Sequence, residues 1–304
     1  MQEFAYDIEK NIFDLRARLV SQQWTHDQYT MFHVCDPKPR IVHKATVSNR
    51  IVHHAIVRHI EPLFERSFIF DTWSCRTGKG THAAMLRAHE KLRELSQKTK
   101  GEIWVLQCDI KKYFQSVDHD ILTRILQKNI IDTETLTLLR NIIDSFSPGI
   151  PLGNLTSQLF ANIYLNPFDH FVKEILRPAS YIRYCDDFFL THPSREYLVN
   201  CYRQIDTFLK TRLHLTLHPN KIHLHPFRYG IDFLGHVLYP DGRRLRHVSR
   251  KRMQRRVQEA VNELSTGKRS YASTCAIIAS YKGMVQYASS HYDDELLDLL
   301  KQCL

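Results

Sequence analysis

Two adjacent carboxylates interrupt what would otherwise be a pair of apolar strands. The segment Tyr181–Thr191 consists of two short apolar runs, and Asp186 and Asp187 stand between them. Neighbouring like charges beside an apolar core are costly unless they are protonated, hydrogen-bonded or bound to cations. Asp is also common in hairpin turns, which is the simplest explanation of the doublet. The pair therefore predicts two strands joined by a tight turn, and alone it does not define a site.

A third carboxylate ends another apolar strand. Residues 103–106 are Ile-Trp-Val-Leu, and the strand expected here ends at Asp109. If this strand lies beside the hairpin, Asp109, Asp186 and Asp187 converge at one end of a sheet. Three such carboxylates can hold two divalent ions about 4 Å apart, as in-line phosphoryl displacement requires. Because Mg²⁺ prefers oxygen ligands, the pattern favours the chemistry of a magnesium-dependent polymerase.

The spacing of apolar residues predicts an alternation of helices and short strands. Helices are expected over 4–24, from Ser48 as N-cap to about 60, and over 81–96, 118–130, 132–146, 156–176, 194–212, 250–264, 274–289 and 294–303. Strands are expected before Asp109, within 181–191, and over 221–226 and 231–239. The segment 36–40 reads as an extended breaker, because residues before Pro avoid the helical region. This order is typical of an α+β fold with helices on one face of a small antiparallel sheet.

Charge and composition restrict the class of protein. The 304 residues carry a formal net charge of +10, and residues 241–270 hold ten Lys and Arg against three Asp and Glu. Such a cationic face suits a phosphate backbone, although a solvated helix face gives the same pattern. No run approaches the length of a membrane span and no signal peptide begins the chain, so we expect an intracellular, cytoplasmic protein without membrane partners. The seven scattered Cys predict neither a disulfide framework nor a zinc ribbon.

Three motifs, in this order along the chain, resemble those of reverse transcriptases. Gln107–His119 resembles the first catalytic motif, Gly149–Leu165 the motif that contacts template and nucleotide, and Tyr184–Asp187 the Y-x-D-D box. The resemblance covers roughly residues 36–240. It implies a right-hand polymerase of α+β class. The N-terminal helix and fingers would span 1–100, the palm with interleaved finger elements 101–240, ending in a primer grip, and a short basic helical thumb 241–304.

The middle motif indicates which type of reverse transcriptase the chain resembles. Most retroviral and group II intron enzymes have Gln before the Gly and Ser-Pro after it, whereas this chain has Leu152 before Gly153 and then Ser157-Gln158. Together with Thr72–Ala84, the pattern is similar to the reverse transcriptases of diversity-generating retroelements, in the group II intron-like superfamily. Members of that family copy a template-repeat RNA into cDNA with errors at adenines, and the cDNA then diversifies a target gene by mutagenic retrohoming. The resemblance implies a prokaryotic or phage-encoded chain.

The resemblance also implies roles for single residues. The ligands of two Mg²⁺ ions, for which Mn²⁺ can substitute, would be Asp109, Ile110, Asp186 and Asp187, and Lys221 would protonate the leaving pyrophosphate. The nucleotide would be contacted by Lys38, Arg40, Ile110, Lys112, Tyr113, Phe114, Leu152, Gly153 and Gln158. Template and primer would be contacted by Arg76, Lys79, Ser157, Tyr184, Phe233, Leu234, Gly235, Arg252 and Arg256. The implied partners are template RNA, a DNA or RNA primer with its cDNA, dNTPs, and a small basic accessory protein.

Two of these positions carry a specific physical expectation. Phe114 stands where an aromatic ring would block the ribose 2′-hydroxyl, although a buried Phe at a strand-to-helix turn gives the same sequence. Leu152 replaces a polar side chain near the nucleotide sugar. Losing ~1–3 kcal/mol of discrimination there would raise misincorporation roughly 10–200-fold.

Other functions stay open. An RNA-binding module can use a similar α+β sheet, but it has no reason to keep the three carboxylates together. An RNA-dependent RNA polymerase would have to admit ribose, against which Phe114 argues. Retron-type, group II intron-type and defence-associated reverse transcriptases are further alternatives, although no retron signature occurs. About 65 residues follow the primer grip, which we expect to form a thumb without further domains. A zinc site is disfavoured because no Cys accompanies the run His214, His218, His223 and His225.

Overall fold

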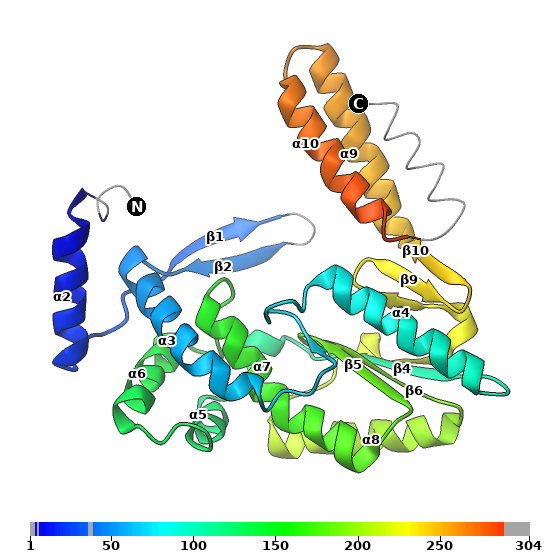
Figure 1. Cartoon of the computed structure of the whole chain (residues 1–304), viewed down its shortest axis with the longest axis horizontal. Coiled ribbons are helices and arrows are strands. Elements are labelled where there is room, and N and C mark those ends of the chain that lie inside the picture. The colour runs from blue at the N-terminus through cyan, green and yellow to red at the C-terminus, as the bar shows by residue number, and fades with distance from the viewer. Residues whose placement is uncertain (1–3, 5, 36–38, 289–304) are drawn as a thin grey trace.

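The computed structural model describes residues 4, 6–35 and 39–288 (Figure 1). Its helices are α2 Ile8–Val20, α3 Val47–Glu65, α4 Thr81–Lys98, α5 His119–Gln127, α6 Thr133–Asp144, α7 Leu155–His170, α8 Arg195–Arg212, α9 His247–Ser265 and α10 Tyr271–Val285. Its strands are β1 Thr30–Val34, β2 Arg40–Lys44, β3 Thr72–Trp73, β4 Trp104–Asp109, β5 Ser180–Tyr184, β6 Asp187–His192, β7 His223–Pro226, β8 Ile231–Phe233, β9 His236–Tyr239 and β10 Gly242–Leu245. None of the helices in this part of the chain is long and apolar enough to cross a membrane.

A five-stranded sheet in the order β3-β5-β6-β4-β7 forms the centre of the molecule. Strand β4 pairs antiparallel with β6 and β7, and β5 pairs antiparallel with β6, whereas the two-residue strand β3 runs parallel to β5. The predicted α+β class is therefore confirmed, with a mixed sheet in place of a purely antiparallel one.

Helices cover both faces of this sheet, so the prediction of helices on one face is wrong. Alternate strand residues such as Leu106 and Phe188 pack in one hydrophobic cluster with α7 and α8. Their neighbours Val105 and Phe189 pack in a second cluster with α4. Because both residue sets are apolar, each face of the sheet needs a cover, and α4 and α8 lie on opposite sides of it in Figure 1.

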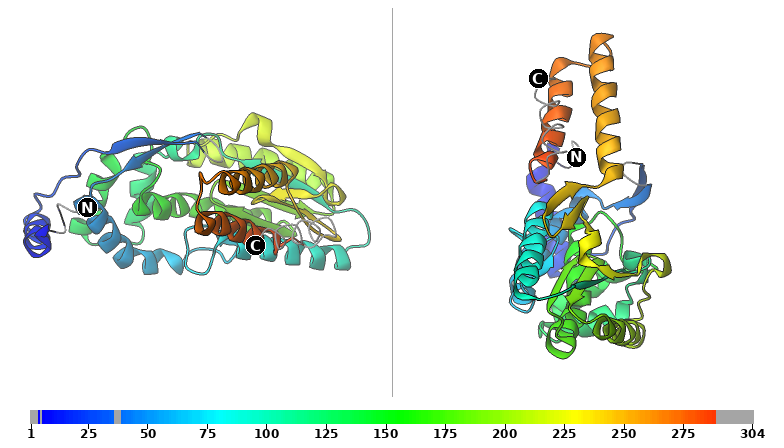
Figure 2. Two further views of the ribbon diagram at one scale, coloured as in Figure 1. Left: turned by 90° about the horizontal axis from the view of Figure 1, so that it is seen from above. Right: turned by 90° about the vertical axis from the view of Figure 1, so that its right-hand side faces the viewer.

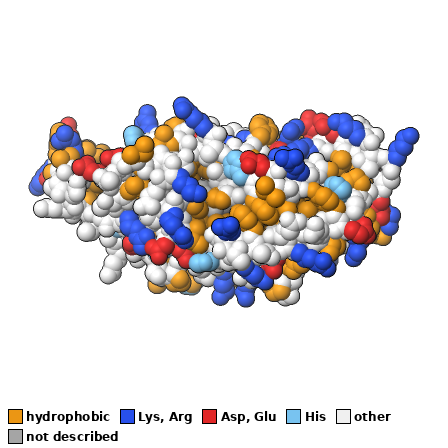
Figure 3. Space-filling view, turned by 90° about the horizontal axis from the view of Figure 1, so that it is seen from below, with side chains coloured by type: hydrophobic (Ala, Val, Ile, Leu, Met, Phe, Trp, Pro, Cys, Tyr) orange, Lys and Arg blue, Asp and Glu red, His pale blue; other side chains and the backbone are white. Residues whose placement is uncertain are grey.

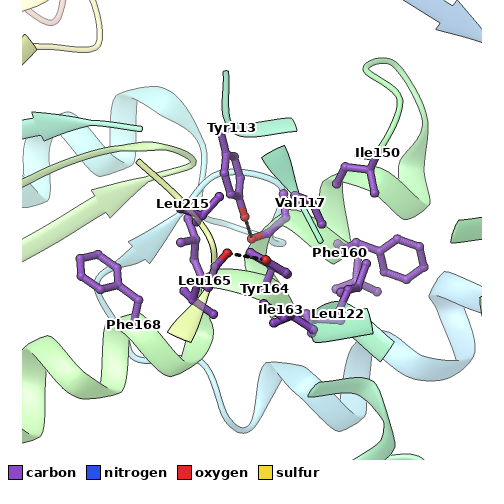
Figure 4. Packing of buried hydrophobic residues seen from close by; sticks show 14 of the residues in the cluster. Tyr113, Val117, Leu122, Ile150, Phe160, Ile163, Tyr164, Leu165, Phe168 and Leu215 are labelled. Atoms are coloured by element: carbon purple, nitrogen blue, oxygen red, sulfur yellow. Dashed lines mark hydrogen bonds between the residues drawn. The ribbon is translucent and has the colours of Figure 1, made fainter. Parts of the chain in front are cut away.

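The larger cluster continues beyond the sheet between α5 and α7. Figure 4 shows part of it, with Tyr113 and Tyr164 among aliphatic side chains. The Tyr164 hydroxyl donates to the Leu213 carbonyl at 2.6 Å and accepts from the Asp118 amide at 3.2 Å. Buried hydroxyls are tolerated because they are hydrogen-bonded in this way. This packing fixes the segment after β4 against α7.

Two hairpins extend from this body. The β1–β2 hairpin lies on one side, and α9 and α10 form a helical hairpin that projects beyond the small sheet β8-β9-β10 (Figures 1 and 2). A cluster of Leu245, Met253, Ile278 and Val285 holds α9 against α10. The face of the molecule on the opposite side from this hairpin carries Lys and Arg interspersed with Asp and Glu (Figure 3). The densest run of Lys and Arg, within residues 241–270, lies in the segment that forms β10 and α9.

The local predictions differ from the structure at several places, and strands β3 and β10 were not predicted. The N-cap of α3 is Thr46, whose hydroxyl accepts from the Asn49 amide, and not Ser48. The segment 231–239 is a hairpin, because Leu234 and Gly235 both adopt positive φ, and not one strand. The last turn of the helix predicted to 176 is a π-helix over Phe171–Leu176. The β1–β2 hairpin was not predicted at all, and the helix predicted over 294–303 lies outside the described residues.

Candidate active site

The turn between β5 and β6 is as tight as the sequence predicts. Tyr184 pairs with Asp187, which leaves only Cys185 and Asp186 in the loop. Cys185 adopts φ +57°, as two-residue hairpin turns require. The Tyr184 hydroxyl lies 3.0 Å from the Thr81 hydroxyl at the start of α4. The turn is thereby held between the sheet and α4.

The structure brings the three carboxylates together. Asp109 is the direct partner of Asp187 in the antiparallel pair of β4 and β6. The amide of Ile110 donates to the Asp186 carbonyl at 3.3 Å, so the chain leaving β4 is bonded to the turn. Residues paired across antiparallel strands have Cβ atoms about 4.5–5.5 Å apart. The end of β4 and the β5–β6 turn therefore form one acidic cluster.

The acidic cluster, defined as Asp109, Asp186 and Asp187, carries negative charge that its surroundings destabilise. The pKa of Asp187 is raised to about 7, mainly because the carboxyl is buried. The Gln107 amide lowers this pKa by hydrogen bonding, and the charges of Asp109 and Asp186 raise it. Burial and the charge of Asp109 also raise the pKa of Asp186. Desolvation and like charge both act against ionisation, and a bound cation reverses that effect.

Lys221 is bonded to this acidic cluster. Its Nζ donates to Asp109 Oδ2 at 2.6 Å. A cavity of about 260 Å³ opens beside this ion pair, and its lining residues are Gln107, Cys108, Asp109, Asp187, Lys221, His223, Asp232 and Arg246. Lys221, the predicted general acid, therefore contacts the acidic cluster and lines this cavity.

The donor chemistry of the acidic cluster fits a hard divalent ion, because its ligands are carboxylate oxygens. Among the residues that the structure describes, no three His, Cys, Asp or Glu side chains form a ready-made metal site. Asp109 is instead paired with Lys221. A cation would therefore compete with Lys221 for Asp109.

The segment after β4 presents its backbone next to this cluster. Lys112 adopts φ +48°, and such left-handed residues help to turn successive amides to one side as an anion nest. The Tyr113 side chain is buried, and its hydroxyl donates to the Ala161 carbonyl at 2.5 Å, so only its backbone is available to a nucleotide. The Phe114 ring is half-buried and packs edge-on against Tyr113.

The loop before α7 is joined to the segment after β4 and to the β1–β2 hairpin. The Ile150 amide donates to the Phe114 carbonyl at 2.8 Å, and a Cβ added to Gly149, at φ +74°, would lie 2.2 Å from that oxygen. The His43 amide of β2 donates to the Leu152 carbonyl at 2.9 Å. Only glycine therefore fits position 149, and Leu152 is fixed against the hairpin.

Other predicted nucleotide contacts are placed around this loop. Arg40 is exposed at the start of β2, in the hairpin that contacts Leu152. Gly153, at φ +111°, approaches Val42 of the same strand closely. Gln158 is exposed on α7, whereas Ser157 beside it is buried. Lys38 lies outside the described residues.

Two cations predicted to contact the template have internal partners instead. The Arg76 guanidinium binds both oxygens of Glu65 and donates to the carbonyls of Ile69 and Thr72. Lys79 donates to the Phe70 carbonyl at 2.6 Å and lies over the Phe70 ring. The structure does not bring either side chain to the acidic cluster.

The predicted primer grip is the β8–β9 hairpin. Phe233 is fully buried, and Leu234 and Gly235 form the turn at φ +53° and +87°. Arg252 and Arg256 lie further along, on α9. Arg256 lies 4.0 Å from Glu259. The hairpin positions the start of α9 relative to the sheet.

Several residues that line the cavity were not predicted as site residues, Gln107, Asp232 and Arg246 among them. Gln107 Nε2 donates to the Asp232 carbonyl at 2.7 Å and lies 3.4 Å from Asp187 Oδ1. Arg246 Nε donates to the Asp232 carboxylate at 2.7 Å. Gln107 could have been found, because it stands two residues before Asp109 and so shares its strand face. Asp232 and Arg246 reach the cavity only through the pairing of separate hairpins.

Comparison with known proteins identifies the family. Residues 35–238 match the family model "Reverse transcriptase (RNA-dependent DNA polymerase)". The protein YkfC of Escherichia coli is 27% identical over 62% of this chain and 60% of its own length. The group II intron-encoded protein LtrA of Lactococcus lactis is 24% identical over 43% of this chain and 22% of its own length. The chain thus spans under two thirds of the length of these curated relatives.

Solved structures support the same fold. Apo telomerase from Candida tropicalis, truncated from its C-terminal domain, matches 77% of this chain and 59% of its own with a TM-score of 0.52 at 11% identity. Telomerase from Candida albicans in complex with a TWJ fragment of telomeric RNA matches 93% of this chain and 64% of its own with a TM-score of 0.51 at 10% identity. The family match covers more than half of the sequence, and the chain therefore belongs to the reverse transcriptase (RNA-dependent DNA polymerase) family.

Proposed function

We propose that the protein is an RNA-directed DNA polymerase that extends a DNA or RNA primer with dNTPs on a template RNA. The observation that carries this proposal is the pairing of Asp109 with Asp187, which puts the end of β4 against the turn that bears Asp186. An RNA-binding module has no need for three carboxylates whose charge its own fold destabilises. Nucleotidyl transfer does need them.

Asp109, Asp186 and Asp187, with the adjacent Ile110, would hold two Mg²⁺ ions, or Mn²⁺ in their place. When bound, these ions would supply Lewis-acid activation of the primer hydroxyl and neutralisation of the pyrophosphate. Lys221 lies close enough to the acidic cluster to hold a proton for the leaving pyrophosphate. Lys112 and Tyr113 would receive the triphosphate on backbone amides, and Arg40 would approach it from the β1–β2 hairpin. Lys38, which lies outside the described residues, would bind the same triphosphate.

Replacing Phe114 with Val should let the enzyme accept ribonucleotides. The half-buried ring follows the backbone of the proposed nest, where it would contact the sugar of the nucleotide. Removing this bulk removes a clash, and rNTP use relative to dNTP use should rise roughly 10–200-fold. Single-nucleotide kcat/KM for dATP and ATP measures this ratio, with Phe171→Val as a control that removes an aromatic ring from a different helix end. An unchanged ratio would assign Phe114 to packing alone.

We further propose that the enzyme belongs to the diversity-generating type and copies a template-repeat RNA with errors at adenines. Leu152 supports this proposal, because an aliphatic side chain cannot hold the nucleotide by a polar contact. The Leu152 carbonyl is bonded to β2, so the residue is fixed where the loop before α7 meets the β1–β2 hairpin. The proposed partner set includes a small basic accessory protein. The basic helix α9, with Arg252 and Arg256, would follow the RNA–DNA duplex by its phosphates.

Leu152→Gln should raise fidelity at template adenines. A polar contact worth ~1–3 kcal/mol would lower misincorporation roughly 10–200-fold. Sequencing the cDNA made on one RNA template by both proteins measures the error rate at each base. Equal error rates at adenines in the two proteins would remove Leu152 from the explanation.

An intron-encoded reverse transcriptase is the second candidate, because the relatives include a group II intron-encoded protein. The two candidates differ in error spectrum. Purified protein, with an RNA template, an annealed DNA primer, dNTPs and Mg²⁺, should make cDNA whose substitutions concentrate at template adenines. Accurate cDNA would favour the intron type and retain the polymerase proposal. Absence of synthesis with Mg²⁺ and with Mn²⁺ would contradict both.

A further inference from the structure

A buried ion pair lies directly behind the turn that carries Asp186 and Asp187. The side chains of Arg183 on β5 and Asp169 on α7 are both 0% exposed. Arg183 Nε donates to Asp169 Oδ1 at 2.7 Å, and Nη2 donates to Oδ2 at 2.6 Å, which makes the contact bidentate. A buried charge is costly unless it is paired and hydrogen-bonded, so this pair requires a full set of partners.

Asp169 has that full set. The Tyr181 hydroxyl donates to Oδ1 at 2.6 Å, and the Thr72 hydroxyl donates to Oδ2 at 2.6 Å. With the two bonds from Arg183, the carboxylate accepts four hydrogen bonds from β3 and β5. Bidentate Arg–carboxylate contacts fix the plane of the guanidinium as well as its distance. Asp169 therefore holds the guanidinium of Arg183 in one orientation.

The other edge of the same guanidinium contacts the turn. Arg183 Nη1 donates to the Cys185 carbonyl at 2.8 Å and to Asn162 Oδ1 at 3.4 Å. The Cys185 carbonyl belongs to the peptide group that joins Cys185 to Asp186. Its orientation determines the direction in which Asp186 leaves the turn. Asn162 in turn donates to the Ser74 carbonyl at 2.9 Å, so the network also reaches the loop after β3.

We propose that Arg183, oriented by Asp169, is a positioning residue that sets the geometry of the Asp186–Asp187 turn for binding divalent ions. The proposal rests on the polymerase function proposed above. The ion pair is neutral as a whole, so it does not compensate the acidic cluster. It acts by holding the peptide from which the ligand side chains project. Residues that orient metal ligands typically change metal affinity or activity by 10–100-fold when they are altered.

Arg183→Lys tests this role, because Lys can keep the charge next to Asp169 but cannot bond both Asp169 and the Cys185 carbonyl in one plane. The affinity of the Arg183→Lys protein for Mn²⁺ should be about 10–100-fold weaker than that of wild type. Electron paramagnetic resonance of the whole protein, without nucleic acid, measures this affinity. In primer extension, kcat should fall and the Mg²⁺ concentration for half-maximal rate should rise. The Kd for template-primer should stay within about twofold, because no nucleic-acid contact changes.

Arg87→Lys is the matched control. Arg87 pairs with the buried Asp71 and with Glu90, and it has no bond to the turn. This variant should bind Mn²⁺ and extend primers like the wild-type protein. If Arg183→Lys does not fold, Tyr181→Phe replaces it, because that change removes one bond to Asp169 and leaves both charges in place. It should shift Mn²⁺ affinity in the same direction by a smaller factor.

The proposal is overturned if the folded Arg183→Lys protein, or Tyr181→Phe in its place, binds Mn²⁺ as tightly as wild type. It is also overturned if Arg87→Lys weakens Mn²⁺ binding equally, because the effect would then be general loosening. Wild-type protein that binds Mn²⁺ but extends no primer would contradict the polymerase function. The Mn²⁺ titration would still decide the positioning role in that case.

Discussion

Asp187→Asn should reduce nucleotide incorporation by on the order of 10³-fold, the upper range for removing one preorganised electrostatic group from an active site. Asn is nearly isosteric with Asp, but its amide lacks the charge that a divalent ion requires. Primer-extension rates at saturating dNTP and Mg²⁺ measure the loss. The same substitution should leave the melting temperature unchanged or higher. The reason is that the substitution removes a charge that is buried beside two other carboxylates. Burial and these neighbouring charges also raise the pKa of Asp187.

The combination of lost activity and retained stability separates a functional carboxylate from a structural one. A carboxylate that stabilises the fold would lower the melting temperature when it is changed to an amide. Asp206→Asn is the matched control, because Asp206 pairs with Lys210 on the surface of α8 and, among the described residues, no bond joins that pair to the acidic cluster. That variant should incorporate nucleotides at the wild-type rate. Activity of Asp187→Asn within tenfold of wild type would contradict the assignment.

Lys221→Met should lower kcat by roughly 10²-fold, within the range for general acid catalysis. Met keeps the length of the side chain but cannot carry the proton for the leaving pyrophosphate. The KM for dNTP should change little, because the expected role concerns the leaving group. Single-turnover primer extension at several Mg²⁺ concentrations gives both values.

The ion pair with Asp109 offers a simpler role for Lys221, as a counter-charge that a divalent ion displaces. In that case Lys221→Met would leave kcat unchanged at saturating Mg²⁺, and half-maximal activity would need less Mg²⁺. This result would remove Lys221 from the chemistry. Lys210→Met, which breaks an exposed pair of similar length, should change neither quantity.

The acidic cluster could be predicted because its determinants are local. The apolar runs before Asp109 and around the Asp186–Asp187 doublet each specify a strand with a carboxylate at its end. One antiparallel register then puts Asp109 opposite Asp187. The two-residue turn fixes the register of β5 against β6, because turn length sets the register of a hairpin. The register of β4 against β6 is known only from the structure, because both faces of these strands are apolar.

Other features could not be predicted because their partners are distant or their pattern is ambiguous. The role of Arg76 depends on Glu65 at the end of a neighbouring helix, which no spacing rule connects to it. The β1–β2 hairpin carries exposed apolar residues, Met31 and Ile41 among them, and so lacks the alternation of a half-buried strand. The pair Asp169–Arg183 reads in the sequence as two ordinary charges. Only the fold shows that both are fully buried.

The central claim is that Asp109, Asp186 and Asp187 bind divalent ions at which DNA synthesis occurs. The most direct measurement is the anomalous scattering of Mn²⁺ in crystals of the protein with an RNA template, a DNA primer and a dNTP. We expect anomalous peaks within bonding distance of the three carboxylates, with the dNTP phosphates at the same ions. Mn²⁺ peaks elsewhere on the protein, with none at the acidic cluster, would contradict it.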